Sequence, residues 1–210
     1  MRIKIIFFFA FVICFSVQGQ YLKNEFSINF IPSISLFYGH PYYNDFKSKL
    51  AFSIGATYNY YCSERALLQL GVLFEQKGAK VGVDYFDDNG NYYQTSNITF
   101  KRNYLVVPVV CSFVSKTRVK FYIGGGFFLG YLLSAEDLNS KVLINETFAS
   151  KTQKFDFGIN LGSGCFIPIH DRFSLDLGIK ENLGLYNTLI NDLATKNNTI
   201  GLQVGIKYKF

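Results

Sequence analysis

The sequence has few residues whose type and spacing could support catalysis. Its two histidines are His40 and His170, and only His40 has nearby hydroxyl groups, on Ser35 and Ser48. A histidine beside a serine could act as a base and a nucleophile in an acyl-transfer enzyme. The spacing is not specific for such an enzyme, and an isolated histidine in a loop is far more often a solvated side chain. No catalytic residue is predicted.

Glycines and cysteines do not indicate a cofactor or metal site either. Gly124, Gly125 and Gly126 stand inside an apolar strand pattern, whereas a phosphate-cradling loop needs a following helix. Three cysteines follow the N-terminal segment: Cys62, Cys111 and Cys165. Their number is odd and they are widely spaced. Such spacing argues against a disulfide framework and matches no metal-ligand motif, so no cofactor and no metal are expected.

The N-terminus has the pattern of a secretory signal peptide. Arg2 and Lys4 precede an apolar run of eleven residues, 5–15, and small residues follow at Val17 and Gly19. We expect cleavage after Gly19, so that residues 1–19 are a signal peptide and residues 20–210 form one domain. Removing Arg2 and Lys4 leaves 19 of the 21 basic residues against 15 acidic ones, a net charge of +4. These charges are scattered, which favours contact with anionic lipid headgroups over a nucleic-acid surface.

The last eight residues, 203–210, show the clearest strand pattern. Apolar or aromatic residues alternate with Gln203, Gly205 and two lysines, which is typical of a strand with one apolar and one polar face. The order of Gln203, Gly205, Tyr208 and Phe210 resembles the signal by which the outer-membrane barrel-assembly machinery recognises a terminal strand. That machinery and outer-membrane lipid are therefore expected partners.

Seven earlier segments alternate in the same way. With the last strand they predict eight strands, at 26–38, 50–61, 66–78, 104–114, 119–133, 152–167, 173–186 and 198–210. Short turns follow the second, fourth and sixth strands. Long links follow the first, third, fifth and seventh strands. The link after the third includes a hairpin tip at 87–91, whose Asn-Gly pair suits a tight turn. This asymmetry is typical of outer-membrane barrels with short periplasmic turns and longer extracellular loops.

The composition of the two strand faces decides between a membrane barrel and a soluble lipocalin-like barrel. The polar face is rich in glycine and sparse in charge, which suits a crowded lumen better than a solvated exterior. We therefore predict an all-β fold, an eight-stranded antiparallel up-and-down transmembrane β-barrel in the outer membrane. In the run 104–110, YLVVPVV, both faces are apolar and the orientation stays open.

Two groups of residues are candidates for a functional role. Five charged residues on the polar strand faces could form an ion-pair network in the lumen: Glu75, Lys77, Asp156, Asp176 and Lys180. Four aromatic residues near the tip of the longest hairpin could form an interaction surface: Tyr85, Phe86, Tyr92 and Tyr93. The aromatic group could equally pack the hairpin against its neighbours.

Several motifs together resemble the PorT-like outer-membrane β-barrel family of the Bacteroidetes lineage. They are LLQLGVLFEQKGAK at 67–80, YLVVPVV at 104–110, FDFGINLGSG at 155–164, GIKENLGLYN at 178–187 and the closing KYKF at 207–210. The resemblance covers nearly the whole chain after the signal peptide and implies an eight-stranded outer-membrane barrel. It carries no catalytic motif, and its founding member is linked to protein secretion and gliding.

Three functional hypotheses follow. The first is a non-enzymatic barrel that acts through its extracellular loops or as an accessory part of an envelope or secretion assembly. The second is a narrow porin-like channel for small solutes. The third is a lipid-modifying enzyme at the barrel rim, with His40 as its base. The filled lumen and the poor catalytic inventory favour the first.

Overall fold

The computed structural model describes residues 24–39, 46–86, 90, 92–138, 152–188 and 195–210. The expected signal peptide lies outside these residues. Within them the strands are β1 (Asn24–Tyr38), β2 (Phe46–Lys47), β3 (Lys49–Tyr61), β4 (Ala66–Lys77), β5 (Lys80–Phe86), β6 (Tyr92–Val114), β7 (Lys120–Leu138), β8 (Phe155–Pro168), β9 (Phe173–Gly184) and β10 (Lys196–Lys209). No helix in this part of the chain has the length and apolarity needed to cross a membrane.

Antiparallel pairing joins these strands into a closed barrel. β4, β3, β1, β10, β9, β8 and β7 follow one another around the wall, and β6 pairs with both β4 and β7 to close it. β5 continues the direction of β4 beyond the barrel, so β4 and β5 act as one strand interrupted at Gly78 and Ala79. The predicted eight-stranded antiparallel barrel is confirmed.

The two faces of the wall are inverted relative to a soluble barrel. Large apolar side chains point outward, such as Ile28, Leu50 and Ile123, which are 61%, 84% and 67% exposed. The alternate positions are buried and polar, including Ser27, Asn59 and Lys207. A soluble barrel would bury the apolar set, so the lipocalin-like alternative is excluded and the apolar exterior forms a belt for lipid.

The strand register fixes the width of the barrel. Cα partners can be followed around the wall from Leu50 back to β3 through Ile34, Ile200, Glu181, Leu161, Gly125, Cys111, Leu68 and Tyr60. The path returns at Tyr60, ten residues along the strand from Leu50. Eight strands with this stagger are tilted by about 40° and enclose a cylinder of roughly 8 Å radius at the backbone. Such a lumen is filled by side chains.

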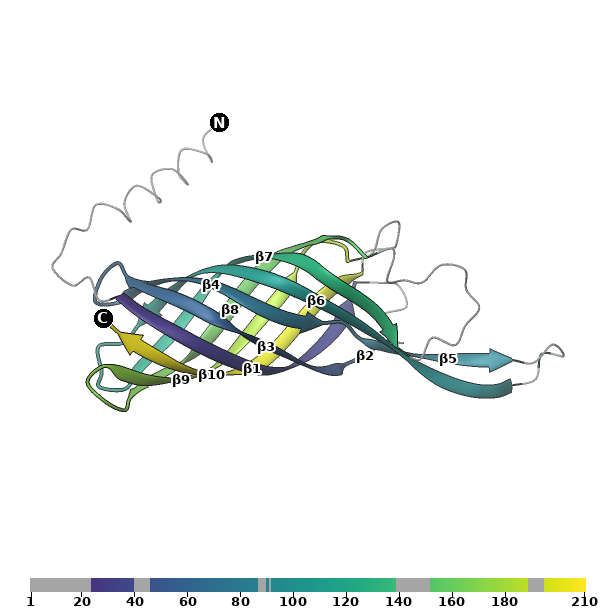
Figure 1. The fold of residues 1–210 in the computed structure, drawn as a ribbon, viewed down its shortest axis with the longest axis horizontal. Coiled ribbons are helices and arrows are strands. Elements are labelled where there is room, and N and C mark those ends of the chain that lie inside the picture. The colour runs from purple at the N-terminus through teal and green to yellow at the C-terminus, as the bar shows by residue number, and fades with distance from the viewer. Residues whose placement is uncertain (1–23, 40–45, 87–89, 91, 139–151, 189–194) are drawn as a thin grey trace, which may run out of the picture.

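The ends of the barrel differ (Figure 1). The turns β3–β4, β6–β7 and β8–β9 and the C-terminus lie at one end, here called the short-turn end. At the other end β5 and β6 leave the wall as a long two-stranded ribbon. Gly90 has a φ of 80°, as an Asn-Gly hairpin tip requires.

Some predicted boundaries were wrong. β7 continues through Leu138, so residues 134–138, predicted as loop, are strand paired with β6. β8 begins at Phe155 rather than at Thr152, and β9 ends at Gly184. Polar side chains at 134–138 masked the strand, because polarity alone does not end a strand that has a partner. At Pro32, which has no N–H donor, the pairing of β1 with β10 is interrupted, and the register is the same on both sides.

Gly78 should be essential where the ribbon leaves the barrel. Its φ is 128°, and an added Cβ would lie 2.0 Å from the carbonyl oxygen of Phe100. We expect Gly78→Ala to lower the free energy of unfolding by roughly 1–3 kcal/mol, measured by urea unfolding of the refolded barrel in lipid. Gly82→Ala is the matched control within β5, since the nearest atom to its added Cβ is 3.6 Å away. Equal effects of the two changes would contradict this role of Gly78.

Candidate functional site

A cluster of buried charges fills the half of the lumen nearer the ribbon. Lys77 is fully buried, and its Nζ lies 3.0 Å from Asp156 Oδ2 and 3.7 Å from Glu75 Oε1. Asn182 Nδ2 donates to Glu75 at 2.7 Å, and Asn197 Nδ2 donates to Asp156 at 3.0 Å. β4, β8, β9 and β10 all contribute, so the cluster connects different parts of the wall across the lumen.

The five charged residues predicted for the lumen do not form one direct network. Glu75, Lys77 and Asp156 are in contact, whereas Asp176 lies toward the short-turn end. There Asp176 accepts hydrogen bonds from Tyr122 Oη at 3.1 Å and Gln203 Nε2 at 2.7 Å. Lys180 is buried between the two groups and, with Glu75, lines an interior cavity of about 10 Å³. A space of that size holds about one water molecule.

Apolar side chains also point into the lumen and complete its filling. Toward the short-turn end, Tyr61, Leu67, Val114 and Phe166 form a buried cluster, here called the lower plug. The ring of Tyr122 stacks on that of Phe166 with centroids 4.5 Å apart. A second layer at Tyr104, Val106 and Phe128 packs beside Lys77.

These lumen residues could not be predicted from the sequence for two reasons. The orientation of 104–110 could not be assigned. The structure turns Tyr104, Val106 and Val110 inward and Leu105, Val107 and Val109 outward. No orientation was predicted for Tyr61 and Phe166, which lie at strand ends. The alternation of β3 would have placed Tyr61 on the same face as Thr57 and Asn59, inside.

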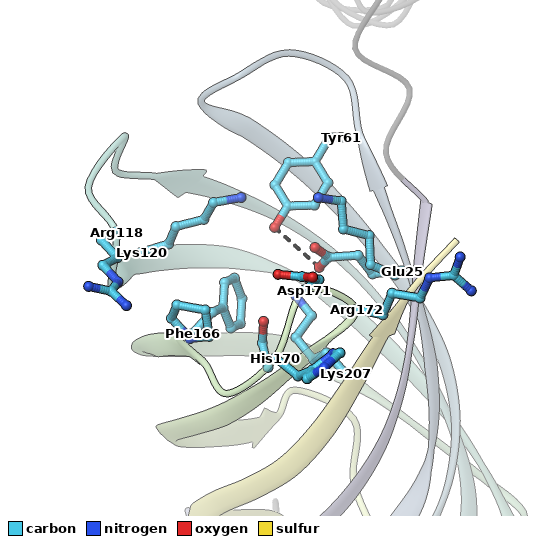
Figure 2. Close-up of a pocket in the computed structure, with 12 residues that line it drawn as sticks. Glu25, Tyr61, Arg118, Lys120, Phe166, His170, Asp171, Arg172 and Lys207 are labelled. Carbon is cyan, nitrogen blue, oxygen red and sulfur yellow. Dashed lines mark hydrogen bonds and ion pairs between the residues drawn. The ribbon is translucent and has the colours of Figure 1, made fainter.

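The short-turn mouth contains a cavity of about 130 Å³ between the lower plug and the short-turn end of the barrel (Figure 2). Its walls carry an excess of basic groups: Arg118, Lys120, His170, Arg172, Lys207 and Lys209, with Glu25 and Asp171 as acidic residues. Glu25 accepts a hydrogen bond from Tyr61 at 3.2 Å and pairs with Lys207 Nζ at 2.8 Å. Lys120 Nζ lies 4.8 Å from the centroid of the Tyr61 ring. The cavity is blind, because Tyr61 and Phe166 belong to the plug above it.

The ribbon end is closed by another apolar cluster and an ion pair. Phe37, Ala79, Ile98 and Phe100 pack together, with Phe46 and Val81 against them, where the ribbon leaves the wall. Beside them Arg102 is fully buried and its Nη1 lies 2.8 Å from Asp137 Oδ1. Both ends of the lumen are therefore covered by described side chains.

The aromatic surface predicted at the hairpin tip is described only in part. The Tyr92 side chain is 61% exposed and its hydroxyl is 3.0 Å from Thr95 Oγ1. The side chains of Tyr85, Phe86 and Tyr93 lie outside the described residues, although their backbones are in the ribbon.

The rim enzyme considered from the sequence has no assembled site among the described residues. His40 lies outside them, and Ser48 is exposed. Ser35 is buried in the lumen, where its Oγ accepts a hydrogen bond from the Gly78 N–H at 2.9 Å. No group of three or more His, Cys, Asp or Glu in the described part of the chain could hold a metal ion.

The residues of the expected assembly signal lie on both faces of β10. Gln203 points into the lumen toward Asp176, and Gly205 packs against Asn29 of β1. Tyr208 faces outward, with its ring 5.2 Å from that of Phe173 and 5.4 Å from that of Phe210. Phe210 is 73% exposed.

Comparison with known proteins identifies the class. The model of the outer membrane protein beta-barrel domain family matches residues 17–189, and the chain belongs to this family. The barrel is therefore an outer-membrane barrel, in which the short turns face the periplasm and the ribbon lies outside the cell.

One solved structure supports this fold, and two others are reported beside it. Neisserial surface protein A, from Neisseria, has a TM-score of 0.53 at 16% identity, with 89% of this chain and 97% of that chain covered. OprG of Pseudomonas aeruginosa has 0.47 at 10% identity, covering 93% and 99%. Ail of Yersinia pestis has 0.46 at 14%, covering 90% and 99%. None of the curated proteins matches the chain in sequence. At these identities the likeness concerns the fold alone.

Removing Lys77 should destabilise the barrel far more than removing an exposed lysine. Lys77→Met leaves two buried carboxylates facing each other, and we expect a loss of about 3–5 kcal/mol in the free energy of unfolding. Lys101→Met, which breaks an exposed pair with Glu136, should change it by less than about 1 kcal/mol. Urea unfolding in lipid measures both.

A combined variant separates charge from packing in the same cluster. Adding Glu75→Gln and Asp156→Asn to Lys77→Met removes the unpaired charges, so much of the lost stability should return. No recovery would mean that the packing of the Lys77 stem, rather than charge pairing, holds this cluster.

Proposed function

We propose that the protein is a closed, non-enzymatic outer-membrane barrel that acts by interaction, through its extracellular ribbon or as an accessory component of an envelope or secretion assembly. A PorT-like role in protein secretion is one specific form of this proposal, suggested by the resemblance to that family alone. Outer-membrane lipid and, during biogenesis, the barrel-assembly machinery are its expected partners.

The filled lumen is the observation that carries the proposal. The lower plug, the Lys77 cluster and the apolar cluster at the ribbon end follow one another along the axis. An ion moving along the axis past these three groups would have to break buried ion pairs, which is energetically unfavourable without a replacement partner. Interaction surfaces must then lie at the ends and on the outside.

The ribbon is the most prominent of these surfaces. Beyond Val81, β5 pairs with β6 alone among the described residues, and residues 92–98 of β6 pair with β5 alone. Strand edges outside the membrane offer backbone donors and acceptors to an added strand. Tyr92 adds an exposed ring to the same ribbon. This arrangement supports binding of an extended segment of a partner protein.

A shortened ribbon tests this role without disturbing the barrel. Residues 82–97 are replaced by Asn-Gly, which joins the paired residues Val81 and Ile98 by a tight turn and keeps the apolar cluster at the ribbon base. We expect a folded barrel that loses its stoichiometric partners, measured as native mass and composition after mild detergent extraction. A wild-type protein extracted as a bare monomer would exclude a stable complex, and partners retained by the shortened variant would exclude the ribbon as the contact.

Conductance across planar bilayers tests closure independently. The refolded wild-type protein should give no discrete current steps, because its lumen is filled. Replacing Tyr61, Tyr122 and Phe166 together by alanine removes the two rings of the lower plug and the Tyr122 ring stacked on it. Ion leakage should increase only modestly, since the Lys77 cluster remains. Regular steps from the wild-type protein would favour the channel hypothesis instead.

A further inference from the structure

Glu181 places a carboxylate on the outer, lipid-facing side of the wall. Its neighbours along β9, Lys180 and Asn182, are buried in the lumen, and Ile179, two positions away, is 54% exposed. The alternation of the strand therefore turns Glu181 outward. Ionisable side chains within the membrane are rare and usually face an interior or a water-filled space, so this position needs a physical explanation.

The register gives the depth of Glu181. It is three strand steps from Leu50, through Ile34 and Ile200, and Leu50 lies at the extracellular end of β3. With strands about 4.8 Å apart and tilted by about 40°, each step descends about 3 Å, so the Glu181 backbone lies about 9 Å below Leu50. This depth is in the outer half of the apolar belt.

A second outward polar side chain lies above Glu181. Asn198 is two residues closer than Ile200 to the extracellular end of β10, near the upper edge of the belt. Its Nδ2 donates to Glu181 Oε1 at 3.1 Å, so the carboxylate reaches upward toward the headgroup region. The Asn198 Oδ1 atom is itself buried, so the accessible acceptor of the pair is the Glu181 carboxylate, which borders the outer face of the wall.

A hollow of about 260 Å³ adjoins Glu181 on the same outer face. Ser163 lies between Ile123 and Ile179 in the register, so one small side chain separates two long ones. Leu161 borders the hollow beside Glu181, and Ile179 is closer to the periplasm than Glu181. The hollow therefore extends from Glu181 toward the middle of the membrane and is walled mainly by aliphatic side chains.

We propose that this face binds one outer-leaflet lipid whose acyl linkage carries N–H or O–H donors. The acyl chain occupies the hollow, and a donor of an amide-linked or hydroxylated chain binds the Glu181 carboxylate, which Asn198 holds in place. A carboxylate at the depth of the linkage, above an aliphatic hollow, matches the order of groups along such a lipid. Donors at this point also compensate the desolvation of the carboxylate. This inference goes beyond the proposed interaction function and does not depend on it.

The absence of tryptophan from the sequence allows a single-residue reporter. Leu161→Trp places an indole at the hollow, and Ile54→Trp places one on β3, far around the wall, at a similar depth. The two native side chains have the same exposure, 47%. Each variant is refolded into phosphatidylcholine whose acyl chains carry bromine, which quenches nearby tryptophan. Unbrominated ceramide, which has an amide and hydroxyls but no phosphate, and lipid A, which has both, are then titrated in separately.

We expect Leu161→Trp fluorescence to recover at low mole fractions of either lipid. This recovery corresponds to about tenfold preference over phosphatidylcholine, which is the effect of one charge-assisted hydrogen bond. The Ile54→Trp reporter should recover only in proportion to dilution of the brominated lipid. Recovery with lipid A alone would overturn the proposal, because phosphate rather than the linkage donors would then determine binding. Equal recovery at both reporters would also overturn it.

Two variants in the Leu161→Trp background test the named groups. Glu181→Leu should bring the preference close to one, and Ser163→Phe should remove it by filling the hollow. Ala56→Phe is the matched control for added bulk, since Ala56 also faces outward between two branched residues, Ile28 and Val72. Heat-dependent gel mobility verifies that each variant is folded. A preference that survives both Glu181→Leu and Ser163→Phe would show that the lipid binds elsewhere.

Discussion

The absence of hydrogen-bonding partners in the lipid core determines this structure. Every backbone N–H and C=O group in the belt must be paired within the wall, so the sheet has to close on itself. The β6–β7 pairing supplies the closure, and the ten-residue stagger around the wall fixes tilt and radius together. Where the chain leaves the membrane this requirement ends. The ribbon of β5 and β6 can then carry unpaired edges that would be intolerable a few residues lower.

The narrow radius explains the composition of the lumen. Side chains from opposite walls meet, so charges inside cannot be solvated and must be paired, as Lys77 is with Asp156 and Glu75. Apolar rings fill the remaining space at the lower plug and beside Lys77. Buried ion pairs are weak contributors to net stability compared with well-packed apolar residues, but removing one partner leaves an uncompensated buried charge. The charged residues of the lumen therefore depend on one another.

Alternation in the sequence was sufficient to predict the barrel and its inverted faces, because a period of two survives in every strand with one polar and one apolar face. It failed where that contrast disappears. In 104–110 both faces are apolar, because one contacts lipid and the other packs in the lumen. In 134–138 the strand has left the membrane, so neither face needs to be apolar. The pairing of Lys77 with Asp156, 79 residues apart, depends on which strands meet across the lumen. Local sequence does not contain that information. Glu181 was missed because the expected functional charges were sought on the lumen face alone.

Closed barrels of this width share an occupied interior, so differences in function between them must arise on surfaces that the fold leaves free to vary. Three such surfaces exist in the described chain: the ribbon, the basic periplasmic mouth and the lipid-facing belt. The ribbon and the mouth are solvated, so charged or aromatic residues there have little energetic cost.

The belt is different, because a carboxylate such as Glu181 is unfavourable there unless it is hydrogen-bonded. A neutral leucine or valine would satisfy the fold equally well at that position. The hydrogen bond from Asn198 compensates only part of the desolvation and leaves the Glu181 carboxylate directed at lipid. The outer wall of β8, β9 and β10 is therefore where the sequence departs furthest from what the barrel itself requires.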